Sequence, residues 1–274
     1  MKKNLLTMLF SLVMLVFFVV PTFAAIEKGQ AFEGTPIIDG VIDEVWANAV
    51  SHQINKLKDG SATSLKADFK LLWDSKYLYV LINVSDPELS YEGEASSTKD
   101  GIELYFDPML VHTDNYTAEP LVMQAFIPAP AEASMLFEGE PTSMGNFAAG
   151  AKKAFALTEQ GYIIEASFDL KTICPDVKMQ AGTVIGLDIQ ANDQVTGDTV
   201  RAAAYGWSDD LNQAWQTTSV LGEVTFIAAP APTAPEVTPD NPGTEDSTIV
   251  VLFGLAFLSP SVITIILIKR KNTI

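Results

Sequence analysis

Between residues 66 and 107, apolar and polar side chains alternate along the chain. Residues 66–73 and 78–85 place apolar side chains at every second position, and the short polar segment Asp74-Ser75-Lys76 separates them. A period of two is that of a β-strand with one buried face, so the two runs predict a β-hairpin. A third run, 101–107, has the same period, and three neighbouring strands with one apolar face require a second layer. The pattern therefore predicts an all-β fold, an antiparallel, jelly-roll-like β-sandwich.

The second half of the chain predicts further strands of the same kind. They are expected in the apolar or alternating runs 121–127, 151–157, 162–168, 185–192 and 200–206. A Gln160-Gly161 turn joins the second run to the third and indicates another hairpin. Only residues 42–49 suggest a helix, and a short one.

The first 24 residues have the pattern of an export signal. Two lysines precede an apolar run from Leu5 to Val20, and Thr22 and Ala24 suit the −3 and −1 positions of a cleavage site. A helix that spans a bilayer requires about 20 apolar residues, and this run is shorter. A cleaved signal peptide over residues 1–24 is therefore favoured over an uncleaved membrane helix. Either interpretation exports the rest of the chain.

The other end has the pattern of a surface anchor. Residues 228–248 are rich in proline, which favours an extended stalk. The apolar residues 249–268 match the thickness of a bilayer and predict one C-terminal transmembrane helix. The short tail 269–274 begins with the basic cluster Lys269-Arg270-Lys271, which belongs on the cytoplasmic side. The remaining residues, 25–227, are expected to form one extracellular domain.

A second form of anchoring is open. The segment Asn241-Pro242-Gly243-Thr244-Glu245-Asp246 resembles the Asn-Pro-x-Thr-Gly variant of a sortase signal, with Glu245 in the place of the glycine. Cleavage there would attach the domain to the cell wall, and without cleavage the apolar segment would hold it in the membrane. Both alternatives place the domain on the cell surface.

Charge restricts the partner. All 34 acidic residues lie between the two termini, where only 12 of the 17 basic residues are found. Such an acidic surface repels nucleic acid and anionic lipid, and it tolerates neutral ligands such as sugars. The single cysteine, Cys174, is expected to be buried. One cysteine and two histidines, His52 and His112, are too few ligands for a zinc cluster.

Catalysis is not indicated by any pair of carboxylates. A glycosidase requires two of them at a fixed separation, and in so acidic a chain pairs such as Asp209 with Asp210 or Glu92 with Glu94 occur by chance. We therefore expect a protein that is not an enzyme.

A polar face is expected on the predicted sheet. It would carry Glu103, Tyr105, Asp188, Gln190, Asn192, Arg201, Tyr205 and Trp207. Carboxylates, amides and a guanidinium beside aromatic rings suit a sugar, whose hydroxyl groups form hydrogen bonds while its C–H face stacks on a ring. The alternative is an ordinary solvated face, since antiparallel sheets commonly expose one polar side.

Several segments, in order, resemble family 9 carbohydrate-binding modules. They are 37–46 (IIDGVIDEVW), 72–80 (LWDSKYLYV), 100–107 (DGIELYFD), 161–166, 185–193 and 207–215. The resemblance extends over residues 35–226. It implies a β-sandwich, often attached to glycoside hydrolases, that clamps the end of a sugar chain between two tryptophans.

The resemblance also implies site residues. Trp215 lies where the second clamp tryptophan is expected, and Asn212 and Glu103 lie at sugar contacts. The first clamp tryptophan is missing, since residues 96–99 are Ser-Ser-Thr-Lys, and Gln124 stands about where the family has an arginine. Loss of one stacking surface removes about 1–3 kcal/mol of binding, although Tyr91 on the same loop is a candidate substitute. With the polar face included, the expected sugar-binding residues are Trp215, Asn212, Glu103, Gln190, Arg201, Gln124 and Trp207.

The function expected from these observations is non-catalytic binding of poly- or oligosaccharides at the cell surface, in support of glycoside hydrolases in trans. The alternative is a structural or adhesion module with the same fold and a degenerate sugar site. No cofactor is expected, and the metal ligands are unknown. Structural calcium is a candidate at Asp39 and Asp43, because such modules often bind it, while an ordinary Asp-Gly turn is the simpler interpretation.

Overall fold

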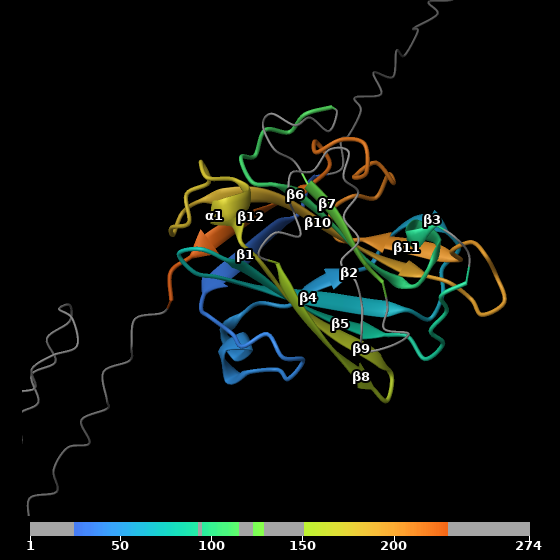
Figure 1. Ribbon diagram of the computed structural model, residues 1–274. Helices are drawn as coiled ribbons and strands as arrows, with labels where there is room; N and C mark the ends of the chain where they lie inside the picture. The colour runs from blue at the N-terminus through green and yellow to red at the C-terminus, as the bar shows by residue number, and fades with distance from the viewer. Residues whose placement is uncertain (1–24, 93–94, 115–122, 129–150, 230–274) are drawn as a thin grey trace, which may run out of the picture. The chain divides into compact units, whose positions relative to one another are not determined.

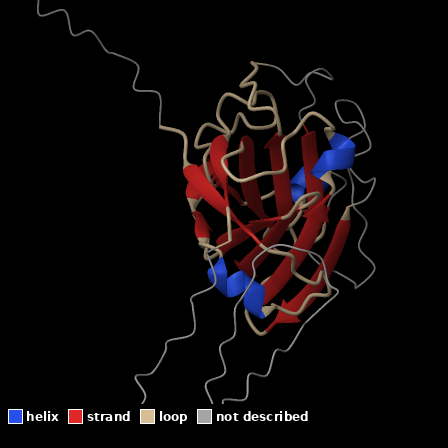
Figure 2. Cartoon of the chain, turned by 90° about the vertical axis from the view of Figure 1, so that its left-hand side faces the viewer, coloured by secondary structure: helices blue, strands red, loops and turns tan. Residues whose placement is uncertain are grey.

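The computed structural model describes residues 25–92, 95–114, 123–128 and 151–229 (Figure 1). The expected signal peptide, transmembrane segment and basic tail lie outside these ranges, as does the expected stalk beyond Ala229. Within the described ranges, no helix combines the length and the apolar character needed to cross a bilayer. Strands form the body of the domain, and its short helical segments lie at the margins (Figure 2).

One layer of the domain is an antiparallel sheet. In spatial order it contains β2 (His52–Ile54), β4 (Lys66–Trp73), β5 (Leu78–Ser85), β9 (Gly161–Phe168) and β8 (Lys152–Thr158). β4 and β5 form the predicted hairpin, and Asp74 shapes its turn because one carboxylate oxygen accepts hydrogen bonds from the backbone N–H groups of Lys76 and Tyr77, each at 2.8 Å. β8 and β9 form the second predicted hairpin.

The other layer is built around β10 (Val184–Asp193). One edge of β10 pairs with β6 (Gly101–Asp107), which pairs in turn with β7 (Met123–Pro128). The other edge of β10 pairs with β12 (Gly222–Ile227) near the start of β10 and with β11 (Ala203–Gly206) near the end of β10. β11 pairs in turn with β3 (Lys56–Gly60). β6 therefore lies in the layer opposite the β4–β5 hairpin, and the prediction that these three strands are neighbours is wrong.

β1 (Lys28–Glu33) connects the two layers. It pairs with β12 on one side and with the end of β4 on the other, so that the hydrogen bonds run through a single 12-stranded sheet. Both pairings are parallel. The predicted antiparallel arrangement is thus correct for the other described pairs and wrong for β1.

The apolar side chains of both layers meet in one core. Phe69 and Ile82 contribute to it from the first layer and Leu104 and Leu187 from the second, all without exposed surface. Burying a side chain of this size stabilises the fold by about 1.5–3 kcal/mol. Cys174, which follows the short helix α1 (Leu170–Ile173), lies at the edge of this core as a buried free thiol, as expected.

The outer face of the first layer is covered by the loop that contains η1 (Glu44–Asn48), a 3₁₀ helix at the expected place. Trp46 is fully buried there against Leu72, Tyr79 and Leu81. Its indole N–H donates to Glu165 at 3.0 Å. Burial raises the pKa of Glu165, while this bond and others oppose the rise.

The Asp-Gly turn in this loop uses both of its aspartates for hydrogen bonds to the backbone. Asp39 accepts from the N–H of Val41 at 2.9 Å, and Asp43 accepts from the N–H of Ile37 at 2.5 Å. Gly40 adopts a φ of 86°, which favours glycine. These contacts support the simpler interpretation, in which the two carboxylates shape a turn.

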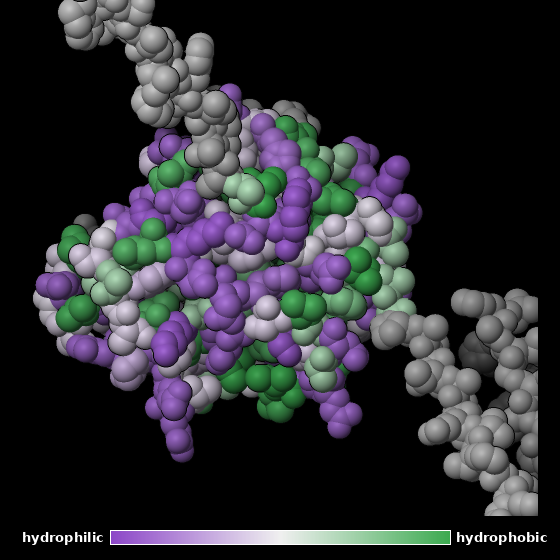
Figure 3. Space-filling model, turned by 180° about the vertical axis from the view of Figure 1, so that it is seen from behind, coloured by the Kyte–Doolittle hydropathy of each residue, from purple (hydrophilic) through white to green (hydrophobic). Residues whose placement is uncertain are grey.

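The surface is largely polar, as the composition predicts. In Figure 3, hydrophilic residues cover most of the visible face and apolar residues are scattered among them. Isolated apolar side chains at a surface are normal for a folded domain. This face therefore gives no indication of a large apolar docking surface.

Candidate functional site

A hydrogen-bonded polar cluster lies on the side of β6 and β10 that faces away from the core. Its centre is Glu103, whose carboxylate accepts hydrogen bonds from the hydroxyl of Tyr105 at 2.6 Å, the amide of Gln190 at 3.0 Å and the amide of Asn192 at 2.7 Å. The register places Gln190 directly opposite Glu103, which explains why residues 87 positions apart meet. Four of the polar residues expected to share a face are thus brought together.

Arg201 closes one side of this polar cluster. Its guanidinium donates to Asp59 at 2.7 Å and to the side-chain oxygen of Asn192 at 3.4 Å, and it lies 3.7 Å from the carboxylate of Glu103. The Arg201 side chain retains 18% of its exposure, against 5% for Glu103. Arg201 is therefore the more accessible of the two charged groups.

Beside the polar cluster, a buried ion cluster consists of Lys58, Asp188 and Asp209. The Lys58 ammonium lies 2.7 Å from Asp209 and 4.0 Å from Asp188, and all three side chains have no exposed surface. Burial raises the pKa of Asp188 to about 6. Burial also disfavours the charged form of Asp209, but Lys58 and hydrogen bonds from the backbone N–H groups of Ala214 and Leu211 together outweigh it and hold the pKa of this carboxyl below its usual value. Asp209 is thus the main counter-ion of Lys58.

The buried ion cluster fixes the loop between β11 and β12. Asp188 accepts hydrogen bonds from the N–H groups of Ser208 and Asp209, at 2.8 and 3.2 Å. Asp209 in turn accepts from the N–H groups of Gln213 and Ala214, at 2.7 and 2.8 Å. The backbone of residues 208–214 is therefore held by two buried carboxylates.

Trp215 follows this anchored segment and is 54% exposed. Its indole N–H donates to the carbonyl oxygen of Asn212 at 3.0 Å, and Asn212 has a φ of 55°, in the left-handed region. The preceding residue, Ala214, is buried and packs against Tyr105 of the polar cluster. Trp215 is thus an accessible loop residue, and the backbone carbonyl of Asn212 helps to orient its ring.

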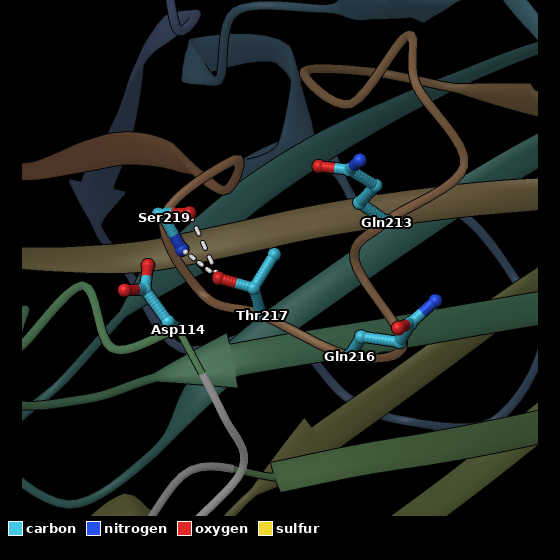
Figure 4. Close-up of a pocket in the computed structure, with 5 residues that line it drawn as sticks. All are labelled: Asp114, Gln213, Gln216, Thr217 and Ser219. Carbon is cyan, nitrogen blue, oxygen red and sulfur yellow. Dashed lines mark hydrogen bonds between the residues drawn. The ribbon is translucent and has the colours of Figure 1, made fainter.

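A small polar pocket lies on the same loop. It has a volume of about 230 Å³ and is lined by Asp114, Gln213, Gln216, Thr217 and Ser219 (Figure 4). Small-molecule sites usually measure about 300–1,000 Å³. The pocket has room for a small polar group rather than for an oligosaccharide.

Trp207 does not belong to the polar cluster, and the expectation that it lies on the polar face is wrong. It is 4% exposed and packs in the core edge-to-face against Phe69, with 5.3 Å between the ring centres. Tyr205 lies in the same core. The alternating pattern correctly placed Trp207 and Tyr205 on one face, but this face is the buried one. On β11, Ala204 and Gly206 stand opposite Asn192 and Gln190 of the polar cluster. A period of two does not specify which face is buried.

The other expected residues are only partly described. Gln124 stands opposite Tyr105 in the register of β7, and its side chain lies outside the described part of the structure. Tyr91, the candidate substitute for the missing clamp, is partly buried and packs against the core. The sequence did not indicate that Lys58 and its two aspartates form one cluster. Lys58 lies on β3, which pairs with residues about 145 positions away, and no local pattern in the sequence predicts such a pairing.

The family assignment follows from comparison with known proteins. The family model described as "Carbohydrate family 9 binding domain-like" matches residues 38–229. The chain belongs to this family. The sandwich that carries the polar cluster and the exposed tryptophan is therefore a family 9 domain.

Similar regions occur in larger enzymes. The chain is 33% identical over 204 residues to endo-1,4-beta-xylanase C of Paenibacillus barcinonensis, and 33% identical over 196 residues to endo-1,4-beta-xylanase A of Thermotoga maritima. These matches cover 74% and 71% of this chain but 17% of each xylanase. The matched part is the family 9 module, which is a binding domain and not a catalytic one, so this family 9 domain is not an enzyme.

Solved structures confirm the fold. A family 9 module of Caldicellulosiruptor kristjanssonii in complex with cellotriose superposes with a TM-score of 0.64 at 23% identity, covering 78% of this chain and 100% of that one. The same module in complex with glucose gives a TM-score of 0.63, also at 23% identity, covering 76% of this chain and 100% of that one. At this identity the likeness supports the family 9 fold and does not by itself transfer site residues.

Proposed function

We propose that this domain binds poly- or oligosaccharides at the cell surface without acting on them. The observation that supports this most is the exposed face of Trp215 on a loop fixed by Asp209, next to a residue that packs on the polar cluster around Glu103. An aromatic face beside a carboxylate and amides suits both the C–H face and the hydroxyl groups of a sugar.

The proposed ligands are oligosaccharides of β-linked glucose or xylose. The two solved relatives are complexes with cellotriose and glucose, and the similar regions of known proteins lie within xylanases. Because this chain corresponds to 17% of those enzymes, its proposed role is to hold polysaccharide for glycoside hydrolases supplied in trans.

Calorimetric titration of residues 25–227 with glucose, cellobiose, cellotriose and xylobiose tests this proposal. Electrophoresis through gels containing soluble glucans or xylans extends the test to polymers. Saturable binding of at least one sugar, or retarded migration in one gel, is the expected result. If neither saturable binding nor retarded migration were seen with any plant, host or wall polysaccharide, the proposal would be contradicted.

Replacing Glu103 by Gln is expected to weaken sugar binding by about tenfold. The amide keeps the size of the side chain, but hydrogen bonds to a charged acceptor are about twice as strong as neutral ones, and about 1.4 kcal/mol corresponds to a factor of ten. Calorimetric titration measures the change, with Glu159→Gln in the exposed β8–β9 turn as the matched control. Equal affinities of the Glu103→Gln variant and the parent would remove Glu103 from the site.

A structural or adhesion role is the second candidate. It is favoured by the Arg201 guanidinium, which already bonds to Asp59 and Asn192 beside Glu103. It is also favoured by Ser-Ser-Thr-Lys at residues 96–99, where the resemblance expects a tryptophan. A domain that fails every sugar test while remaining folded would fit this role.

The proposed location is testable on intact cells. Protease added outside should release the domain by cutting in residues 228–248, because extended backbone is cleaved before folded strands. Immunoblotting of the medium would detect a fragment that ends shortly after Ile227. Recovery of the uncut domain from the cytosol would contradict export, and a sortase-deficient strain would show whether Thr244 is the processing site.

A further inference from the structure

The turn that presents Trp215 is bound to one buried carboxylate. Asp209 is 1% exposed, and its Oδ2 accepts hydrogen bonds from the backbone N–H groups of Gln213 and Ala214, at 2.7 and 2.8 Å. Its Oδ1 accepts a hydrogen bond from the N–H of Leu211 at 2.9 Å. Three of the four residues that precede Trp215 are therefore held by a single side chain.

The same loop is fixed again just after Trp215. The carbonyl oxygen of Thr113, in the segment that follows β6, accepts hydrogen bonds from the hydroxyl of Thr217 at 2.7 Å and from the N–H of Thr218 at 3.0 Å. The hydroxyl of Thr218 accepts in turn from the N–H of Thr113 at 2.8 Å. The backbone is thus held on both sides of the exposed tryptophan.

Asp209 is itself fixed to the underlying sheet. Its carboxylate lies 2.7 Å from the buried ammonium of Lys58, and its N–H donates to Asp188 at 3.2 Å. A Cβ atom at Gly206 of β11 would collide with the carbonyl oxygen of Asp209, so the loop lies directly against the sheet there. The loop therefore has a fixed, charged acceptor, and hydrogen bonds to a charged acceptor are about twice as strong as neutral ones.

Tyr105 connects the loop to Glu103 of the polar cluster. Its hydroxyl donates to Glu103 at 2.6 Å, and its side chain packs against the buried Ala214. The ammonium of Lys58 lies 5.6 Å from the centre of the Tyr105 ring. Because the N–H of Ala214 is bonded to Asp209, this carboxylate also influences where Trp215 lies relative to Glu103.

We propose that Asp209 is a positioning residue of the sugar site, which holds the ring of Trp215 in place for a ligand that Asp209 does not touch. The indole N–H of Trp215 donates to the carbonyl oxygen of Asn212 at 3.0 Å, and Asn212 lies between two residues bonded to Asp209. A group that is already in place avoids the cost of being immobilised when the ligand binds. This inference rests on the proposed function and adds to it a residue without access to the ligand.

Calorimetric titration of the variant Asp209→Ala with the sugars that bind the parent tests the proposal. The affinity should fall by about two- to tenfold, because the freed ring must be immobilised again when sugar binds. The variant Asp209→Asn should lie between the two, since its amide offers one neutral acceptor in place of the carboxylate. Both variants should fold, because Lys58 keeps Asp188 as a counter-ion at 4.0 Å.

The matched control is Asp210→Ala. Asp210 is the neighbouring aspartate and is exposed, so its replacement should leave the affinity of the parent unchanged. Sugar binding by Asp209→Ala as tight as that of the parent would overturn the proposal.

A second background shows whether Asp209 acts through Trp215. In a protein that already carries Trp215→Ala, the change Asp209→Ala should cause no further loss of affinity, because the ring that it positions is gone. Residues that act independently would instead give losses that add. An equal loss in both backgrounds would therefore mean that Asp209 acts elsewhere, and the assignment would fall.

The indole N–H signals in a ¹⁵N NMR spectrum test the positioning without sugar. The signal of Trp215, identified by its absence from Trp215→Ala, should shift and exchange faster with water in Asp209→Ala. The signals of the buried Trp46 and Trp73 should stay in place, which would show that the fold is intact. An unchanged Trp215 signal would contradict the proposal. A parent that binds no sugar would contradict the proposed function, while the indole signals would still decide whether Asp209 positions Trp215.

Discussion

Replacing Lys58 by Met is expected to lower the free energy of unfolding by about 3–5 kcal/mol. Methionine fills a similar volume, but it leaves Asp188 and Asp209 buried without their cation. Removing one partner of a buried ion pair is strongly destabilising because the remaining charge is uncompensated. Chemical denaturation followed by tryptophan fluorescence measures the change.

The control for this prediction is Lys66→Met at the exposed start of β4. Surface substitutions of this kind usually change stability by no more than about 0.5 kcal/mol. The loop of residues 208–214 should also become more accessible to protease in the Lys58→Met variant, since its backbone is bonded to the two aspartates. A loss of less than about 1 kcal/mol would show that the aspartates accommodate the change without Lys58.

The second prediction concerns Trp215, whose replacement by Ala should weaken sugar binding by about 1–3 kcal/mol, or about fivefold to more than a hundredfold. The same change should leave the melting temperature nearly unaltered. Trp215 is 54% exposed, so its truncation removes little apolar surface from the core. Calorimetric titration and a thermal melt of the same preparations measure the two effects separately.

Leu211→Ala is the matched control for Trp215, because Leu211 is a 61% exposed apolar residue on the same loop. It should retain the affinity of the parent, since a leucine offers no aromatic face. Equal losses in the two variants would indicate a general disturbance of the loop. Full affinity of Trp215→Ala would move the sugar site toward Glu103, Gln190 and Arg201.

The hairpins were predictable from the sequence because their pairing is local. β4 and β5 are joined by a short turn, so the alternation of each strand and the turn residues between them are sufficient. The place of β6 was not predictable in this way. It pairs with β10 at a distance of about 80 residues, and its alternation is equally compatible with either layer.

The same limit applies to the candidate site. Glu103, Gln190 and Asn192 were expected on one face and do share one, because two long alternating strands specify their faces reliably. Trp207 was placed on the wrong side because β11 is short and its alternating residues are alanine, tyrosine and glycine. The buried ion cluster was not found at all, since Lys58, Asp188 and Asp209 come from β3, β10 and the loop after β11.

The position of β12 between β1 and β10 has a mechanical consequence. The loop that carries Trp215 enters β12 at Gly222, and the chain leaves the same strand at Ile227. A pull between a ligand held on that loop and the chain beyond Ile227 would act along the strand axis. Because β12 is already extended, its covalent backbone would carry this load directly between the two points, and the hydrogen bonds to β1 and β10 would bear little of it. The rest of the sandwich would then stay folded under a pull of this kind.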